Sequence, residues 1–125
     1  MAPLTQQEVD ALMDELKPLT TSEEMRVKLG MKVYDAQSEG IKYYGRTYVE
    51  DLLKFIHAAA NEAEYRKLID CSAMQHKTRK VNKEQFLSGQ PVFIQVFKEV
   101  LKQGHNAQSM EKLFKDMIPA IANKI

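Results

Sequence analysis

The stretch "CSAMQHKTRKVNKEQF", residues 71–86, decides the fold assignment because it places one histidine where a helical pattern runs into a basic segment. His76 admits two interpretations. One neutral imidazole at a helix end can be the axial ligand of a haem iron, or it can be a polar residue that favours the negative end of the helix dipole. The residues on either side of this stretch bear on the choice.

Apolar residues repeat with the 3.6-residue period of an α-helix along the chain, and no strand-like alternation extends over a useful length. The expected helices cover residues of about 6–17, 22–37, 47–60, 62–75, 83–103 and 107–122. Helix 83–103 is apolar on more than one face and should lie centrally, and Pro91 must kink it or mark its true start. The sequence therefore predicts an all-α fold of six helices in one domain over residues 1–125.

Helix starts are indicated in the sequence by a Ser, Thr or Asn that is followed three residues later by Glu or Gln. In such a pair each side chain satisfies a backbone N–H group that the helix leaves free. The matching segments are "TQQE" (5–8), "TSEE" (21–24), "TYVE" (47–50), "NEAE" (61–64) and "NKEQ" (82–85). Each precedes an apolar stripe, so together they favour the helical interpretation.

The composition is that of an ordinary globular protein, with 125 residues of which 44% are hydrophobic and 28% charged. The net charge of +1 gives no reason to expect nucleic acid or a membrane as partner. The chain has one cysteine, no signal-peptide pattern at its start and no apolar run as long as a membrane span. A soluble protein of the cytoplasm is the expectation.

Sequence motifs for nucleotide binding, for zinc proteases, for calcium-binding loops and for paired CxxC sites are absent. The histidines His57, His76 and His105 are far apart, so a three-histidine zinc site has no support. We therefore predict no enzymatic activity and no catalytic residue, which leaves His76 as the one metal-ligand candidate.

The segment around His76 resembles the proximal segment of globins. In that family a histidine at a helix end is followed by a basic turn, then by Val and then by a Phe that opens a long apolar helix. His76, Val81 and Phe86 match that spacing. The run "VFIQVFKEVL" (92–101) resembles the globin helix that follows, and "SMEKLFKDMIPAIANKI" (109–125) resembles the final one.

Upstream, "YYGRTYVEDLLKFI" (43–56) resembles the distal helix of globins. This resemblance puts Tyr44 at the distal position and implies that Tyr48, one turn later, faces the haem ring. The segment "EVDALMDELKP" (8–18) resembles the helix after the first, and "EEMRVKLGMKV" (23–33) resembles the corner that usually carries a Phe. The chain is thus similar to shortened globins that lack the first helix.

This resemblance implies a haem cofactor with His76 as the axial iron ligand, and reversible binding, storage or sensing of a diatomic gas such as oxygen. The residues expected to line the haem site are Tyr44, Tyr48, Leu52, Ser72, Val81, Phe86, Met13 and Leu29. The chain departs from the family where Leu29 or Met31 replaces the corner Phe and where Ser72 replaces a Leu beneath the haem ring. Both changes weaken the haem slot more than the fold.

The alternative is an all-helical protein–protein interaction module without haem. His76 would then cap its helix or face water, where a cation favours the helix C-terminus. The seven Met and five Tyr residues would serve a partner surface.

Overall fold

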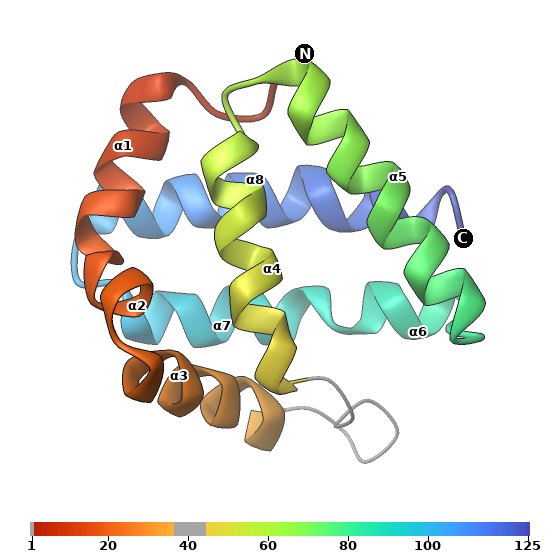
Figure 1. Ribbon diagram of the computed structural model, residues 1–125, viewed down its shortest axis with the longest axis horizontal. Coiled ribbons are helices and arrows are strands. Elements are labelled where there is room, and N and C mark those ends of the chain that lie inside the picture. The colour runs from red at the N-terminus through yellow and green to blue at the C-terminus, as the bar shows by residue number, and fades with distance from the viewer. Residues whose placement is uncertain (1, 37–44) are drawn as a thin grey trace.

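The protein folds as a set of packed α-helices, seen in the computed structural model of Figure 1. The structure describes the backbone of residues 2–36 and 45–125 and the side chains of 2–29 and 49–125. Its helices are α1 (Gln6–Glu15), α2 (Lys17–Thr21), α3 (Glu23–Ala36), α4 (Gly45–Ala58), α5 (Glu62–Thr78), α6 (Lys83–Ser88), α7 (Gln90–Val100) and α8 (Gly104–Ala122). No strand occurs in these ranges, which confirms the all-α prediction. None of the described helices is long and apolar enough to cross a membrane.

Proline explains the two differences from the six expected helices. Pro91 lies in the first turn of α7, so the helix expected over 83–103 is divided into α6 and α7 at Gly89. Pro18 likewise lies in the first turn of α2, which the sequence did not predict as a separate element. A proline ring clashes with the carbonyl group of the preceding turn, but its fixed φ suits a helix start.

Capping side chains begin α1, α5 and α6 where the sequence predicted them. At α1 the Thr5 hydroxyl accepts from the Glu8 amide at 3.2 Å, and the Glu8 carboxylate accepts from the Thr5 amide at 2.9 Å. Asn82 and Gln85 form the same reciprocal pair at α6, at 2.8 and 3.0 Å. Asn61 caps α5 through the Glu64 amide. Each cap satisfies backbone donors that the first helical turn leaves free.

Two of the predicted starts are displaced. At α3 it is Ser22, and not Thr21, whose hydroxyl accepts from the Met25 amide at 3.3 Å. The segment 47–50 lies inside α4, which already begins at Gly45. Both shifts are within the few residues by which a local pattern locates a helix boundary.

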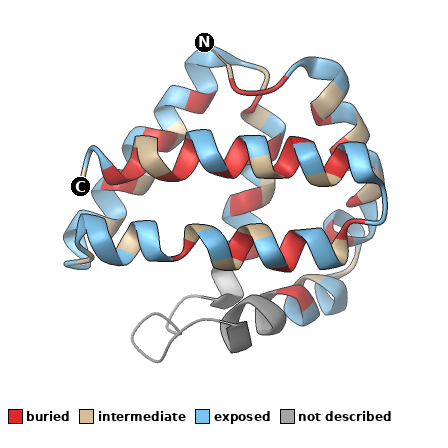
Figure 2. Ribbon diagram, turned by 180° about the vertical axis from the view of Figure 1, so that it is seen from behind, coloured by how far each residue is buried: buried red, intermediate tan, exposed pale blue. Residues whose placement is uncertain are grey.

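The core lies where α7 and α8 run side by side, with α4 crossing them (Figure 1). Helix α8 packs against α1, α5, α6 and α7, and buried residues recur along both α7 and α8 (Figure 2). The ring of Phe114 is fully buried, with its centroid 5.8 Å from Phe93 and 5.5 Å from Phe97. The aromatic contacts fix the two helices against one another, because offset and tilted rings gain energy beyond their buried area.

Helix α4 presents to this core the apolar stripe that the sequence predicted. Val49, Leu52 and Ile56 are buried, and Leu53 packs partly buried against the same cluster. These positions repeat at three- and four-residue intervals, so they occupy one face of the helix. Helix α4 also packs against α5, the helix that carries His76.

Candidate functional site

His76 lies in the last turn of α5, and a tight reversal of the chain fixes its backbone. The amide of Val81 donates to the carbonyl oxygen of His76 at 2.9 Å, and the amide of Lys80 donates to that of Lys77 at 3.0 Å. Lys80 takes a left-handed conformation with φ of 59°. This pair of bonds with a left-handed residue is the Schellman motif that often ends helices. The basic segment of the sequence is therefore the turn that terminates α5.

The ring of His76 is oriented by the preceding turn of α5. Its Nδ1 atom lies 2.7 Å from the backbone carbonyl oxygen of Ser72 and 3.4 Å from the Ser72 hydroxyl oxygen. A carbonyl oxygen can only accept, so the contact assigns the hydrogen of the neutral ring to Nδ1. The lone pair is then on Nε2, on the other side of the ring.

The surroundings of the ring favour its uncharged form. His76 is half-buried, and its ring meets Phe86 edge-on at a centroid distance of 4.7 Å and an interplanar angle of 81°. Burial lowers the pKa of His76, and the positive charge of Arg79 lowers it further, while the Ser72 carbonyl and the Asp51 carboxylate oppose this change. A neutral imidazole with a lone pair on Nε2 is the form that binds a metal. His76 thus fits the requirement for an axial iron ligand.

The structure brings four of the predicted site residues together. Ser72 contacts the His76 ring through Nδ1, Phe86 contacts its edge, and Val81 contacts its backbone. Val81 and Phe86 are both partly buried. The proximal half of the predicted site is therefore a local structure built from the end of α5, the turn after it and α6.

The distal residues of the prediction are only partly within the described part of the chain. Leu52 is buried on α4, which packs against α5. Tyr48 belongs to α4 one turn earlier, but its side chain is outside the described side chains, and Tyr44 lies outside the described residues. The inward orientation of these two tyrosines stays a prediction.

Met13 and Leu29 lie on helices whose main neighbours do not include α5, the helix that carries His76. Met13 is in α1, which packs against α2, α4 and α8, and its side chain is partly buried against the core. Leu29 is buried on α3, which packs against α2, α4 and α7. Helix α5 packs instead against α4 and α8. The helices of Met13 and Leu29 therefore share α4 as a neighbour with α5, and no described contact joins either side chain to the His76 ring.

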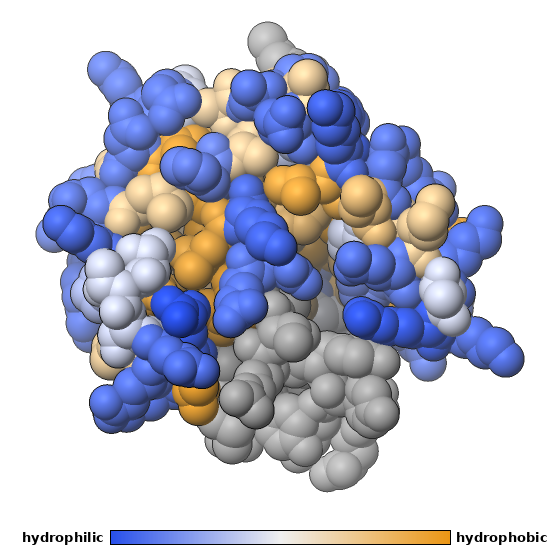
Figure 3. Space-filling model, viewed as in Figure 1, coloured by the Kyte–Doolittle hydropathy of each residue, from blue (hydrophilic) through white to orange (hydrophobic). Residues whose placement is uncertain are grey.

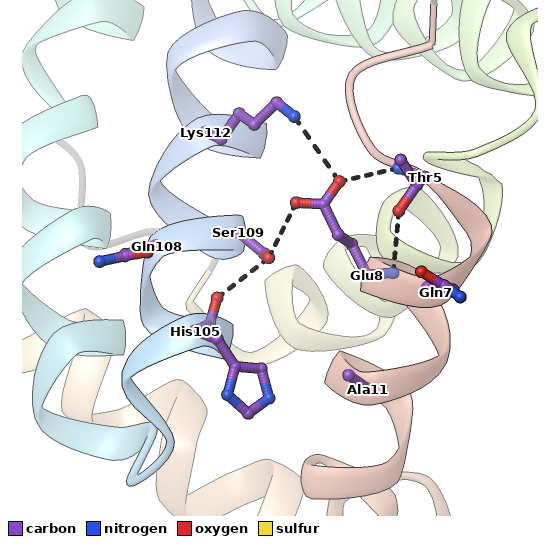
Figure 4. A pocket seen from close by; sticks show the side chains of 8 residues that line it. All are labelled: Thr5, Gln7, Glu8, Ala11, His105, Gln108, Ser109 and Lys112. Atoms are coloured by element: carbon purple, nitrogen blue, oxygen red, sulfur yellow. Dashed lines mark hydrogen bonds and ion pairs between the residues drawn. The ribbon is translucent and has the colours of Figure 1, made fainter.

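A second polar cluster, which the sequence did not predict, joins α1 to α8 (Figure 4). The Glu8 carboxylate accepts from the Ser109 hydroxyl at 3.3 Å and pairs with the Lys112 ammonium at 3.6 Å. The Thr5 amide, and then the charge of Lys112, hold the pKa of Glu8 below its usual value. These groups border a cavity of about 420 Å³ that also reaches His105. The cluster holds the two helices together, because its polar atoms bond to one another.

A buried amide extends the contact between α1 and α8. Asn106 is 2% exposed, and its Nδ2 donates to the Glu15 carboxylate at 2.7 Å and to the Ala11 carbonyl oxygen at 3.2 Å. Glu15 also accepts from the Lys102 amide at 2.6 Å. Asn106 lies just before the helix expected over residues 107–122, so no pattern in the sequence marked it as a buried position of α8. Its partners come from the other end of the chain, so a local pattern could not reveal them.

Comparison with known proteins gives consistent matches. The family model described as Globin matches residues 29–121 of the chain. A protein named Globin from Isoparorchis hypselobagri is 30% identical, over 98% of this chain and 99% of its own length. A protein of the same name from Dicrocoelium dendriticum is 32% identical, over 85% of this chain and 91% of its own.

Proposed function

The chain belongs to the globin family, and on that premise we propose that it binds haem through His76 and reversibly binds a diatomic gas such as oxygen. Globins in general bind such gases through haem, and they do so without catalysing a reaction. Storage or sensing of the gas is the biological role that we infer. The roles in haem binding that we give to individual residues of this chain are part of this proposal.

The observation that carries the proposal is the contact of His76 Nδ1 with the Ser72 carbonyl oxygen at 2.7 Å. It fixes the tautomer, so the Nε2 lone pair is available without any change of protonation. Among the described residues no hydrogen bond to Nε2 competes for that lone pair. A bound haem would supply the iron that binds the gas, and Nε2 of His76 would hold that iron.

The remaining residues have supporting roles in this proposal. Phe86 holds the plane of the imidazole by its edge-on contact, and Val81 and Leu52 supply apolar surface that excludes water. Tyr44 and Tyr48 are proposed to line the distal part of the haem site, where a phenol would donate a hydrogen bond to the gas ligand. Met13 and Leu29 are proposed to act only through the packing of their helices on α4.

The alternative, an interaction module without haem, is not favoured. The face drawn in Figure 3 is dominated by hydrophilic side chains with separate apolar areas between them. Among the described residues, the exposed large hydrophobic side chains are spread over three helices. They are Met25 and Val27 on α3, Met74 on α5 and Leu87 on α6. Singly exposed apolar residues are normal and do not indicate a partner.

The test is a titration of the purified chain with haemin, followed by absorption spectroscopy. We expect stoichiometric uptake with an intense band in the blue, and a spectral change when the reduced protein meets carbon monoxide. His76→Ala should lose the axially ligated spectrum. His57→Ala, an exposed histidine in the last turn of α4, is the matched control and should behave as the wild type. A wild-type chain without uptake, or a His76→Ala chain with an unchanged spectrum, would overturn the proposal.

A further inference from the structure

We propose that Ser72 is a positioning residue for His76, and that its side-chain hydroxyl tunes how strongly the imidazole donates electrons through Nε2 to a bound metal. This inference rests on the proposed function, because the metal in question is the haem iron. It concerns the hydroxyl group and not the backbone carbonyl, which any residue at this position would supply.

Both oxygen atoms of Ser72 approach the same nitrogen. The carbonyl oxygen lies 2.7 Å and the hydroxyl oxygen 3.4 Å from His76 Nδ1. Since the carbonyl contact assigns the hydrogen to Nδ1, the hydroxyl oxygen can take only a second share of the same N–H group. Such three-centre hydrogen bonds are common near helix ends. The hydroxyl is thus the weaker of two acceptors on one donor.

Other hydroxyl groups in the helices of this protein behave differently. Ser109 donates to the His105 carbonyl oxygen at 3.0 Å, and Ser88 donates to that of Gln85 at 2.6 Å. Bonding back to the preceding turn is the usual habit of a helical serine. Within the described part of the chain, the Ser72 hydroxyl instead contacts the His76 ring. The side chain is therefore turned toward the imidazole.

A hydrogen bond accepted from Nδ1–H makes the imidazole a stronger donor at its other nitrogen. A stronger donor favours the oxidised over the reduced metal, so removal of one acceptor should raise the reduction potential. The long distance makes the hydroxyl the smaller contributor, and the effect should be a shift rather than a loss of binding. Contact with Phe86 limits rotation of the ring, so the change should act on electron donation and not on ring orientation.

The experiment compares Ser72→Ala, Ser72→Thr and Ser88→Ala with the wild type. Ser72→Ala keeps the carbonyl and removes the hydroxyl, Ser72→Thr keeps both, and Ser88→Ala removes a hydroxyl that bonds its own helix. In haem-free protein, nuclear magnetic resonance measures the exchange of the His76 Nδ1–H with water. In haem-loaded protein, resonance Raman spectroscopy measures the iron–histidine stretching frequency, and electrochemistry measures the reduction potential.

We expect Ser72→Ala to exchange faster, with a lower stretching frequency and a higher potential, and the other two variants to match the wild type. Unchanged values in Ser72→Ala, in a chain that does bind haem, would overturn the role of the hydroxyl and leave the proposed function intact. A wild-type chain that takes up no haem would overturn the proposed function and this inference together, and the exchange measurement would still report whether the hydroxyl contact exists.

Discussion

The phenol group of Tyr65 donates a hydrogen bond of 2.6 Å to the Asp116 carboxylate and so ties the first turn of α5 to α8. Tyr65 is fully buried, and its ring meets Phe55 of α4 edge-on at 6.3 Å. Burial, and then the bond to Asp116, raise the pKa of Tyr65, so the phenol remains a donor at any physiological pH. One side chain therefore holds α5 in place relative to both α4 and α8.

Tyr65→Phe should lower the free energy of unfolding by about 1–2 kcal/mol, because it removes a bond to a charged acceptor and keeps the ring. Denaturation in urea measures the change. In a double-mutant cycle, Asp116→Ala in the Tyr65→Phe background should cost less than Asp116→Ala alone. Additive effects of the two substitutions would show that the bond contributes nothing.

Glu8→Gln should remove a pH-dependent part of the stability. The pKa of Glu8 is lowered in the folded protein, so its contribution is present above its usual value of 4.5 and is lost as the pH falls through the folded pKa. At neutral pH the variant should be less stable by about 1 kcal/mol, since the cap and the pairing with Lys112 are weakened. Thermal unfolding between neutral and acid pH should show the two proteins converging toward the acid end. A constant difference at every pH would contradict this.

Substitutions of Asn106 should rank by the charge that they introduce. Asn106→Ala leaves the Glu15 carboxylate and the Ala11 carbonyl without a buried donor, at a cost of about 1–3 kcal/mol. Asn106→Asp should cost more at neutral pH, because a second carboxylate would then face Glu15 in a buried position. Lowering the pH should narrow the gap between the two variants, and urea denaturation at several pH values measures it.

Phe114→Ala should be among the most destabilising single changes, at about 3–5 kcal/mol, because it opens a cavity between α7 and α8. The exposed Met74, at 70% accessible, offers the control, and Met74→Ala should change the stability by less than about 0.5 kcal/mol. Equilibrium unfolding of both variants is the measurement. Similar losses in the two would mean that the aromatic contacts of α7 and α8 are not the centre of the core.

Addition of haemin should raise the thermal midpoint of the wild type, since a ligand that binds only the folded chain stabilises it by about 2.7 kcal/mol at a free concentration of 100 times its Kd. His76→Ala should show a much smaller rise, and His57→Ala the same rise as the wild type. Differential scanning calorimetry at several haemin concentrations measures the effect. An equal shift in His76→Ala would place the haem contact elsewhere.

Local patterns predicted most of this fold because helices are specified by nearby residues. The stripe of α4 and the caps at Thr5, Asn61 and Asn82 lie where the sequence put them. The grouping of Ser72, Val81 and Phe86 around His76 was predictable for the same reason, since these residues are close in sequence. The division at Gly89 confirms one of the two predicted alternatives, that Pro91 marks a helix start, because the preference of proline for a first turn outweighs the continuous apolar pattern.

Contacts between distant segments were not predictable in this way. Glu8 was recognised only as part of a cap, and its bonds to Ser109 and Lys112 depend on how α1 crosses α8. Met13 was expected to line the haem site because of the resemblance to globins, and a resemblance in the order of helices does not say which neighbour a side chain meets. The placement of Tyr44 and Tyr48 remains a prediction, because Tyr44 lies outside the described residues and the side chain of Tyr48 lies outside the described side chains.

The histidine is fastened from two directions, its ring to Ser72 in the turn before and its carbonyl oxygen to Val81 in the turn after. A force on the imidazole therefore cannot be relieved by a side-chain rotation alone. It would act on the turn that contains the left-handed residue Lys80, and through this turn on the cap at Asn82. The start of α6 is in this sense mechanically coupled to whatever tension the ring experiences.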